Sequence, residues 1–113
     1  MPSELPTSSA IAVRLLDELR YEDDQWLWEI VWRLNAEFPL IELADKVSLA
    51  QEVTWQLFND GKIRLLRGNW PEGAVGPLDD AGLKAIREQT LPWHDPEHAE
   101  ILVLLTMPID ASS

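Results

Sequence analysis

The sequence contains no cysteine and few basic residues, and each shortage excludes a class of protein. Without cysteine the chain forms no disulfide bond and offers no thiolate as a nucleophile or metal ligand. Its 9 Lys and Arg face 20 Asp and Glu, and the formal charge of −11 predicts repulsion from nucleic acid and anionic lipid at long range. No apolar run approaches the roughly 18 residues of a membrane span, so we expect no membrane partner.

Length and composition predict one domain. The 113 residues are 46% hydrophobic, which is enough for a single core. We expect that domain over residues 8–106, with a flexible arm at 1–7 and a flexible tail at 107–113. The opening residues MPSELP lack the basic and apolar segments of a signal peptide, which leads us to expect a cytoplasmic protein.

Apolar residues at three- and four-residue spacing predict two helices in the first third of the chain, over residues 8–20 and 24–37. Thr7 or Ser8 is the expected N-cap of the first helix. The acidic residues 22–24 are expected to cap the second, because carboxylates accept free N–H groups and suit the positive end of the helix dipole.

The segment that follows predicts two helices separated by a tight turn. Residues 40–46 form the shorter one, and Ser48 with Gln51 makes an S-x-x-Q capping box that places the start of the next at Ser48. That helix is expected over 48–59. Gly61 then suits the left-handed conformation that ends many helices.

Two strands, a loop and a helix complete the expected elements. Residues 62–67 predict a strand, because the first four alternate between basic and apolar side chains, whereas 69–77 are rich in Gly and Pro and predict a loop. Asp79 is the expected cap of a helix over 80–89. The apolar run at 100–106 predicts a strand covered on both faces.

This order of elements resembles the winged helix-turn-helix superfamily over residues 8–106. The stretch PLDDAGL at 77–83 is also similar to the Leu-Thr-x-x-Gly helix start that follows a wing in many bacterial regulators. The resemblance implies an α/β fold of the mostly helical α+β type, a winged-helix-like domain with a small antiparallel sheet of two or three strands. About thirty residues that hold a helix separate the two expected wing strands, so we expect an inserted helix between them.

In that superfamily the helix corresponding to residues 48–59 enters the major groove of DNA. Gln and Asn on its outward face could read adenine edges. The helix contains no Lys or Arg, however, although a protein making about 6–10 phosphate contacts needs as many donors. The residues expected to face a partner, whether protein or DNA, are Gln51, Trp55, Gln56, Asn59, Lys62, Arg64 and Trp70.

We therefore expect a non-enzymatic protein-interaction or regulatory module that binds a basic partner protein, as an immunity protein or a nucleic-acid mimic does. The competing hypothesis is a dimeric DNA-binding regulator, which the charge disfavours, and a homodimer fits either. Convergence of five cations near the wing would favour the regulator. These are Arg33, Lys46, Lys62, Arg64 and Arg67.

The sequence gives little support for an enzyme, a metal or a cofactor. Residues 93–98, Trp-His-Asp-Pro-Glu-His, are the one stretch with clustered potential metal ligands, together with nearby Glu100. We interpret 91–98 instead as irregular surface structure in which Asp95-Pro96 begins a helical turn. Motifs for nucleotide binding or serine hydrolysis are absent, and we expect no metal, no cofactor and no catalysis.

The six tryptophans are the most unusual feature of the composition. Trp28 and Trp32 lie four residues apart and are expected to widen the core-facing side of their helix. Two interpretations cover the whole set: a tryptophan-rich core, with Trp70-Pro71 and Pro92-Trp93 as rigid lids beside the inserted helix, or an aromatic interaction surface. The members considered for that surface are Trp26, Trp28, Trp32 and Trp55.

Overall fold

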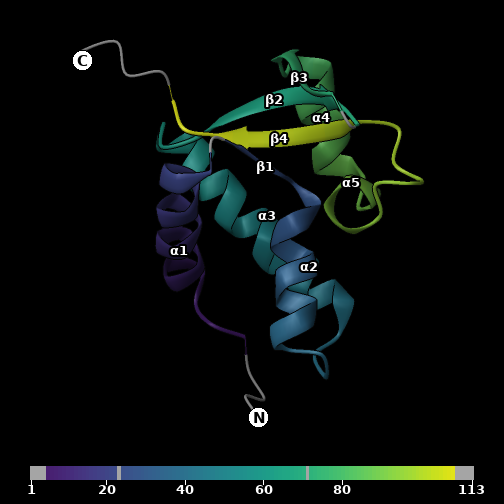
Figure 1. The fold of residues 1–113 in the computed structure, drawn as a ribbon. Coiled ribbons are helices and arrows are strands. Elements are labelled where there is room, and N and C mark those ends of the chain that lie inside the picture. Colours follow the sequence, from purple (N-terminus) through teal and green to yellow (C-terminus); the bar gives the residue numbers. More distant parts are fainter. Residues whose placement is uncertain (1–4, 23, 71, 109–113) are drawn as a thin grey trace.

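A computed structural model describes residues 5–22, 24–70 and 72–108, which form a mixed α+β fold. The elements in chain order are α1 (Ser8–Tyr21), β1 (Asp24–Trp26), α2 (Trp28–Glu37), α3 (Leu43–Asn59), β2 (Arg64–Asn69), β3 (Gly73–Pro77), α4 (Asp80–Glu88), α5 (Leu91–His94) and β4 (Leu102–Thr106). In Figure 1, α1, α2 and α3 lie below the sheet, and α4 and α5 lie toward its right-hand end. The α+β class is therefore confirmed.

The sheet has four antiparallel strands in the order β1-β4-β2-β3, rather than the two or three expected. The last strand of the chain is central, and Leu104 pairs with Trp26 on one side and with Leu66 on the other. Its middle residues are buried, as the apolar run predicted. The expected strand at 62–67 is also present, shifted to Arg64–Asn69.

One apolar cluster forms the core between the sheet and the three N-terminal helices. It includes Leu15 and Leu19 from α1, Val53 and Leu57 from α3, and Leu105 from β4. These helical residues recur at the spacing of one face, so the helical faces predicted for α1 and α3 are confirmed. The side chain of Thr7 accepts a hydrogen bond from the N–H of Ala10 and caps α1, also as predicted.

The expected start of the second helix is wrong. Asp24–Trp26 is a strand paired with β4, and α2 begins only at Trp28 without a side-chain cap. Pairing with β4 buries the side chain of Gln25, and this tertiary interaction overrides the local helix signal. Of the acidic residues proposed as caps, Asp23 lies outside the described residues.

The expected turn before Ser48 is also wrong, because α3 runs unbroken from Leu43 to Asn59. No Gly or Pro interrupts this segment, and buried Lys46, Val47 and Ala50 continue the inward face of Val53. The helix therefore begins after Glu42, whose backbone is extended, and the capping box is not formed. Its end is as predicted: Gly61 has φ +72° in the left-handed region.

The segment expected as a loop at 69–77 contains β3, which pairs with β2 as a hairpin. Gly73, with φ +99°, sits opposite Asn69 and supplies the left-handed conformation that the hairpin needs. The helix α4 and its cap Asp79, which accepts from the N–H of Gly82, are confirmed. The insertion before β4 is larger than expected, since it also holds β3 and α5.

The ends of the described chain contact the core. Leu5 and Met107 are half-buried and pack against it, whereas residues 1–4 and 109–113 of the expected arm and tail lie outside the described ranges. No helix within those ranges has the length and apolarity needed to cross a membrane.

Candidate functional site

Four tryptophans, Trp26, Trp28, Trp32 and Trp70, lie close together around the ends of β1 and β2. Directly paired residues on neighbouring strands share a face, so Trp26, Leu104 and Leu66 lie on the same side of the sheet. Leu104 and Trp28 are buried, yet neither belongs to the core cluster, which shows that they pack separately from it.

Gly68 makes room for this packing. A Cβ at this position would lie 2.7 Å from Leu104 Cδ1 and 2.9 Å from a ring atom of Trp26. The missing side chain therefore lets the indole of Trp26 lie close against β2. Any larger residue at position 68 would displace the indole of Trp26, so glycine is the residue that fits there.

The tryptophan rings form a floor and two walls. Trp28 stacks on Trp26, with centroids 4.7 Å apart and planes at 16°. Trp32 and Trp70 each lie 6.3 Å from Trp28, tilted at 52° and 63°. Trp28 is 5% exposed, against 52% for Trp32 and 66% for Trp70. The two walls therefore carry most of the accessible ring surface.

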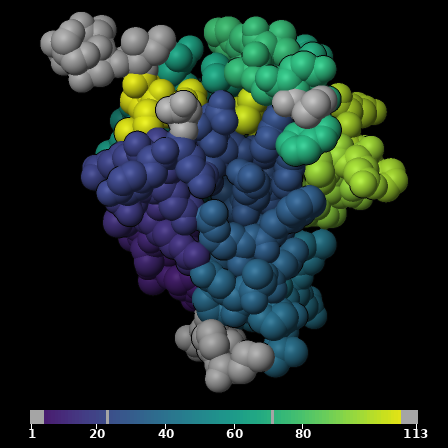
Figure 2. All heavy atoms as spheres, viewed as in Figure 1, coloured from purple at the N-terminus to yellow at the C-terminus, as the bar shows by residue number. Residues whose placement is uncertain are grey.

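Trp28, Trp32 and Trp70 line a groove of about 400 Å³, within the range of ligand sites. The groove is also lined by His94 at the end of α5, by Asp95, Pro96 and Glu97 of the segment after it, and by Leu102, the first residue of β4. The indole N–H of Trp32 donates to the carbonyl oxygen of His94 at 3.1 Å and ties the wall to this segment. Figure 2 shows blue α2, the green β2–β3 hairpin and yellow-green residues around α5 meeting at one edge of the molecule.

The charge that lines the groove is acidic. Asp95 and Glu97 line it together with His94, and no Lys or Arg is among its described lining residues. Oδ2 of Asp95 is 2.8 Å from Nδ1 of His98, so one of the two carboxylates is partly engaged. Nowhere in the described ranges do three potential ligands gather to hold a metal ion.

A further carboxylate is hydrogen-bonded to the backbone of the stacked pair of tryptophans. Glu29 accepts a hydrogen bond at 3.0 Å from the backbone N–H of Trp26. Burial raises the pKa of Glu29, the bond from Trp26 opposes that shift, and the charges of Glu22 and Asp24 add to it. The carboxylate thus fixes the end of β1 at a cost in desolvation.

Two of the predicted partner-facing residues, Trp55 and Trp70, lie in different clusters of aromatic rings. Trp55 is half-buried, contacts Phe58 and the fully buried Trp93, and has the guanidinium of Arg87 4.6 Å from its ring centroid. Trp70 lies in the groove instead. The remaining predicted residues divide by exposure: Gln56, Asn59 and Lys62 are exposed, and Gln51 and Arg64 are half-buried.

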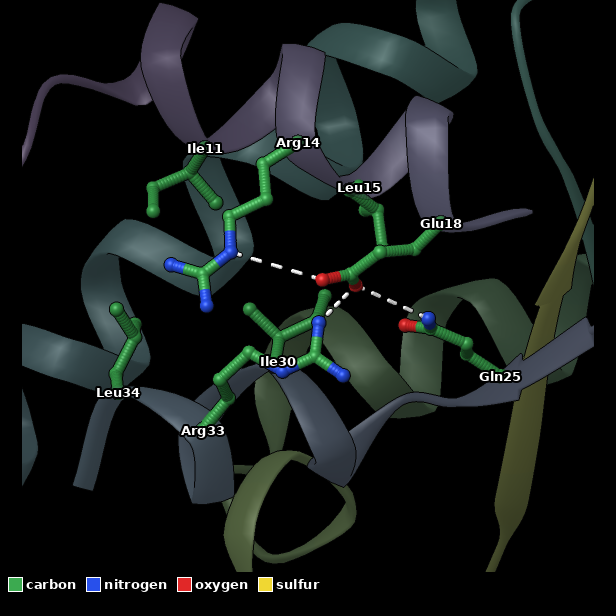
Figure 3. Close-up of a pocket in the computed structure, with 8 residues that line it drawn as sticks. All are labelled: Ile11, Arg14, Leu15, Glu18, Gln25, Ile30, Arg33 and Leu34. Carbon is green, nitrogen blue, oxygen red and sulfur yellow. Dashed lines mark hydrogen bonds and ion pairs between the residues drawn. The ribbon is translucent and has the colours of Figure 1, made fainter. Parts of the chain in front are cut away.

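Two of the five cations named for a DNA contact are engaged elsewhere. Arg33 pairs with Glu18, which also accepts from Gln25 at 3.1 Å and lies 3.6 Å from Nε of Arg14. Figure 3 shows this carboxylate between α1 and α2, beside a cavity of about 20 Å³ that is large enough for one water.

Lys46, the other of the two, is buried and donates to Oδ1 of Asn35 at 2.9 Å. Fewer free cations are therefore left for a DNA contact than the five named. The three that remain are Lys62, Arg64 and Arg67.

The sequence singles out the tryptophans and the acidic segment that line the groove, but it does not predict that they lie together. Trp28 and Trp32 are predicted to widen the core-facing side of their helix, but Trp28 is buried outside the main core cluster and Trp32 is exposed. Residues 93–98 hold the potential metal ligands, and 91–98 are predicted to be irregular, whereas 91–94 form α5 and Asp95 ends it instead of beginning a turn of helix. The spacing of Trp28 and Trp32, and the run of Trp, Pro and acidic residues, were the available signals.

Comparison with protein-family models, with curated proteins and with solved structures gave no match.

Proposed function

We propose that this protein is a non-enzymatic interaction module that holds a basic segment of a partner protein in the tryptophan groove. The observation that carries the proposal is the joining of Trp28, Trp32 and Trp70 with Asp95 and Glu97 around one groove. Aromatic residues are enriched at the centres of protein interfaces, and their exposed ring faces attract cations.

The charge of the chain supports a basic partner. A formal charge of −11 attracts a cationic segment over a long range and speeds its encounter with the groove. The same charge opposes DNA, and the engagement of Arg33 and Lys46 reduces the cations that a DNA contact requires. A basic protein segment therefore fits both the local chemistry and the overall field.

Binding of labelled probes measured by fluorescence anisotropy tests the proposal. We expect a Lys- and Arg-rich peptide to bind, a Glu-rich peptide of the same length not to bind, and salt to weaken the interaction. Trp70→Ala should reduce affinity about fivefold or more, because this indole is a groove wall. Tyr21→Ala is the matched control, since Tyr21 is an exposed aromatic residue on α1 that is not among the described lining residues.

Random-sequence duplex DNA measured alongside separates this proposal from a DNA-binding regulator. DNA binding in the micromolar range at low salt, with no peptide binding, would overturn the proposal. Peptide binding that Trp70→Ala leaves unchanged would move the interface away from the groove and would also overturn it.

A further inference from the structure

The groove offers many ring faces and few hydrogen-bond acceptors. A primary ammonium brings three N–H donors and a guanidinium five, and each donor needs an acceptor when water is removed. The side chains that line the groove supply two carboxylates, and one of them already faces His98. The indole N–H of Trp32 is itself a donor and is used by His94.

The groove presents indole rings in several orientations to one occupant. Trp32 and Trp70 each lie 6.3 Å from Trp28, at 52° and 63° to its plane, and all three line the same groove. Cation–π attraction acts within roughly 6 Å of a ring centroid, and Trp32 and Trp70 are the two of the three rings that are exposed. A planar guanidinium stacks best on one ring, whereas the methyl groups of a tetrahedral cation can meet rings in different orientations.

The chain leaves this position open to a ligand. Over the described part of the molecule, the one cation–π contact is that of Arg87 on Trp55, in the other tryptophan cluster. Trp32 and Trp70 carry no such cation and remain half exposed or more.

We infer that the groove selects a quaternary ammonium group, and that its occupant is a trimethylated lysine side chain on the basic partner protein. The inference rests on the proposed function and specifies the group that it recognises. A trimethylated nitrogen keeps its positive charge but has no N–H donor, so the acidic side chains attract it and no acceptor is missing. Its methyl groups contact the indole faces, which a hydrated primary ammonium does only after losing water.

Calorimetric titration with one basic peptide, unmodified and trimethylated at a single lysine, tests the inference. We expect the trimethylated peptide to bind about tenfold more tightly, and Trp32→Ala and Trp70→Ala each to abolish most of that preference. Tyr21→Ala should leave the preference intact. Circular dichroism of each variant establishes that it is folded, and Trp32→Phe, which keeps a ring face, should retain part of the preference.

The outcomes separate this inference from the proposed function. Equal affinity for the two peptides, with both weakened by Trp70→Ala, would overturn the trimethyl-lysine inference and leave the basic-segment proposal standing. Binding of phosphatidylcholine vesicles or of free choline without either peptide would overturn both, because the cation would then come from a source other than a protein. A trimethyl preference that persists in Trp32→Ala and Trp70→Ala would overturn the assignment of the groove.

Discussion

The molecule contains two clusters of tryptophan with opposite relations to solvent. In the closed cluster, Trp93 is fully buried against Trp55, and Arg87 covers the outer ring. In the open cluster, Trp28 is buried but Trp32 and Trp70 are exposed around a groove. The same side chain thus completes a core in one place and lines a surface cavity in the other.

The two clusters do not differ in the hydrogen bonding of their indole N–H groups. Trp93 donates to the carbonyl of Ile86 at 2.8 Å, and Trp32 donates to the carbonyl of His94 at 3.1 Å. What differs is the ring face, which the chain's own guanidinium occupies in the closed cluster. An exposed tilted pair of indoles, by contrast, leaves apolar surface that a partner can cover.

Removing Trp93 should have the largest effect on stability. Trp93→Ala leaves a cavity in the core and an unpaired carbonyl at Ile86, and we expect a loss of about 3–5 kcal/mol in the free energy of unfolding. Urea denaturation followed by circular dichroism measures it. Trp32→Ala is the control from the open cluster and should cost less than about 1 kcal/mol. Equal losses for the two variants would show that the clusters do not differ in packing.

Adding a methyl group at Gly68 should disturb the open cluster from beneath. Gly68→Ala places a Cβ 2.7 Å from Leu104 Cδ1, and overpacking of this kind costs about 1–3 kcal/mol. Gly76→Ala is the matched control in β3, because a Cβ there meets nothing within 4 Å. The comparison uses urea midpoints, together with the tryptophan near-ultraviolet circular dichroism that reports ring stacking. If both variants behave alike, Trp26 is not packed against β2.

Local signals were sufficient where an element depends on its own residues. Thr7 and Asp79 predicted the starts of α1 and α4, because a cap acts over three residues of chain. The apolar run predicted β4 because both of its faces are covered. The glycine at 61 predicted the end of α3 from its freedom to adopt positive φ.

Elements that depend on distant residues were beyond such reasoning. Asp24–Trp26 becomes a strand through pairing with Leu104–Thr106, some eighty positions later in the chain. Gly73–Pro77 becomes a strand only because β2 is beside it. In α3 a local signal was misleading instead. The capping pattern at Ser48 predicts a helix start, but no residue before it ends the preceding turn, and the helix runs unbroken from Leu43.

The candidate site was unpredictable for the same reason. Its walls come from α2 and from Trp70, the residue that follows β2, and its acidic side comes from the segment after α5. Only the sheet order β1-β4-β2 brings these segments together. Trp70 was nevertheless named as partner-facing from the sequence, and its 66% exposure is compatible with that prediction.

Removing the guanidinium of Arg87 should weaken the closed cluster slightly. Arg87→Gln deletes the charge over Trp55, and we expect a loss of about 0.5–1 kcal/mol. Lys84→Gln on the same helix is the control, because its contact with Glu88 is long and exposed. Urea midpoints at low and moderate salt provide the measurement. A loss in Lys84→Gln as large as that in Arg87→Gln would assign the effect to general charge instead of the ring.

Neutralising Glu29 should give the smallest effect, and the size of that effect should depend on pH. The pKa of Glu29 is raised in the folded protein, so protonation favours the fold: its contribution is fully present below the unfolded pKa and is lost as pH rises through the folded one. Glu29→Gln keeps an oxygen acceptor for the N–H of Trp26 but never ionises. The variant should therefore be more stable than the native chain at pH 7 and nearly equal to it at acid pH.

Glu52→Gln, an exposed change on α3, controls for the loss of one negative charge. Unfolding midpoints of the three proteins across this pH range measure the difference. Lower stability of Glu29→Gln at pH 7 would contradict this prediction. It would mean that the hydrogen bond from the N–H of Trp26 to the charged carboxylate stabilises the fold by more than the burial of that charge destabilises it.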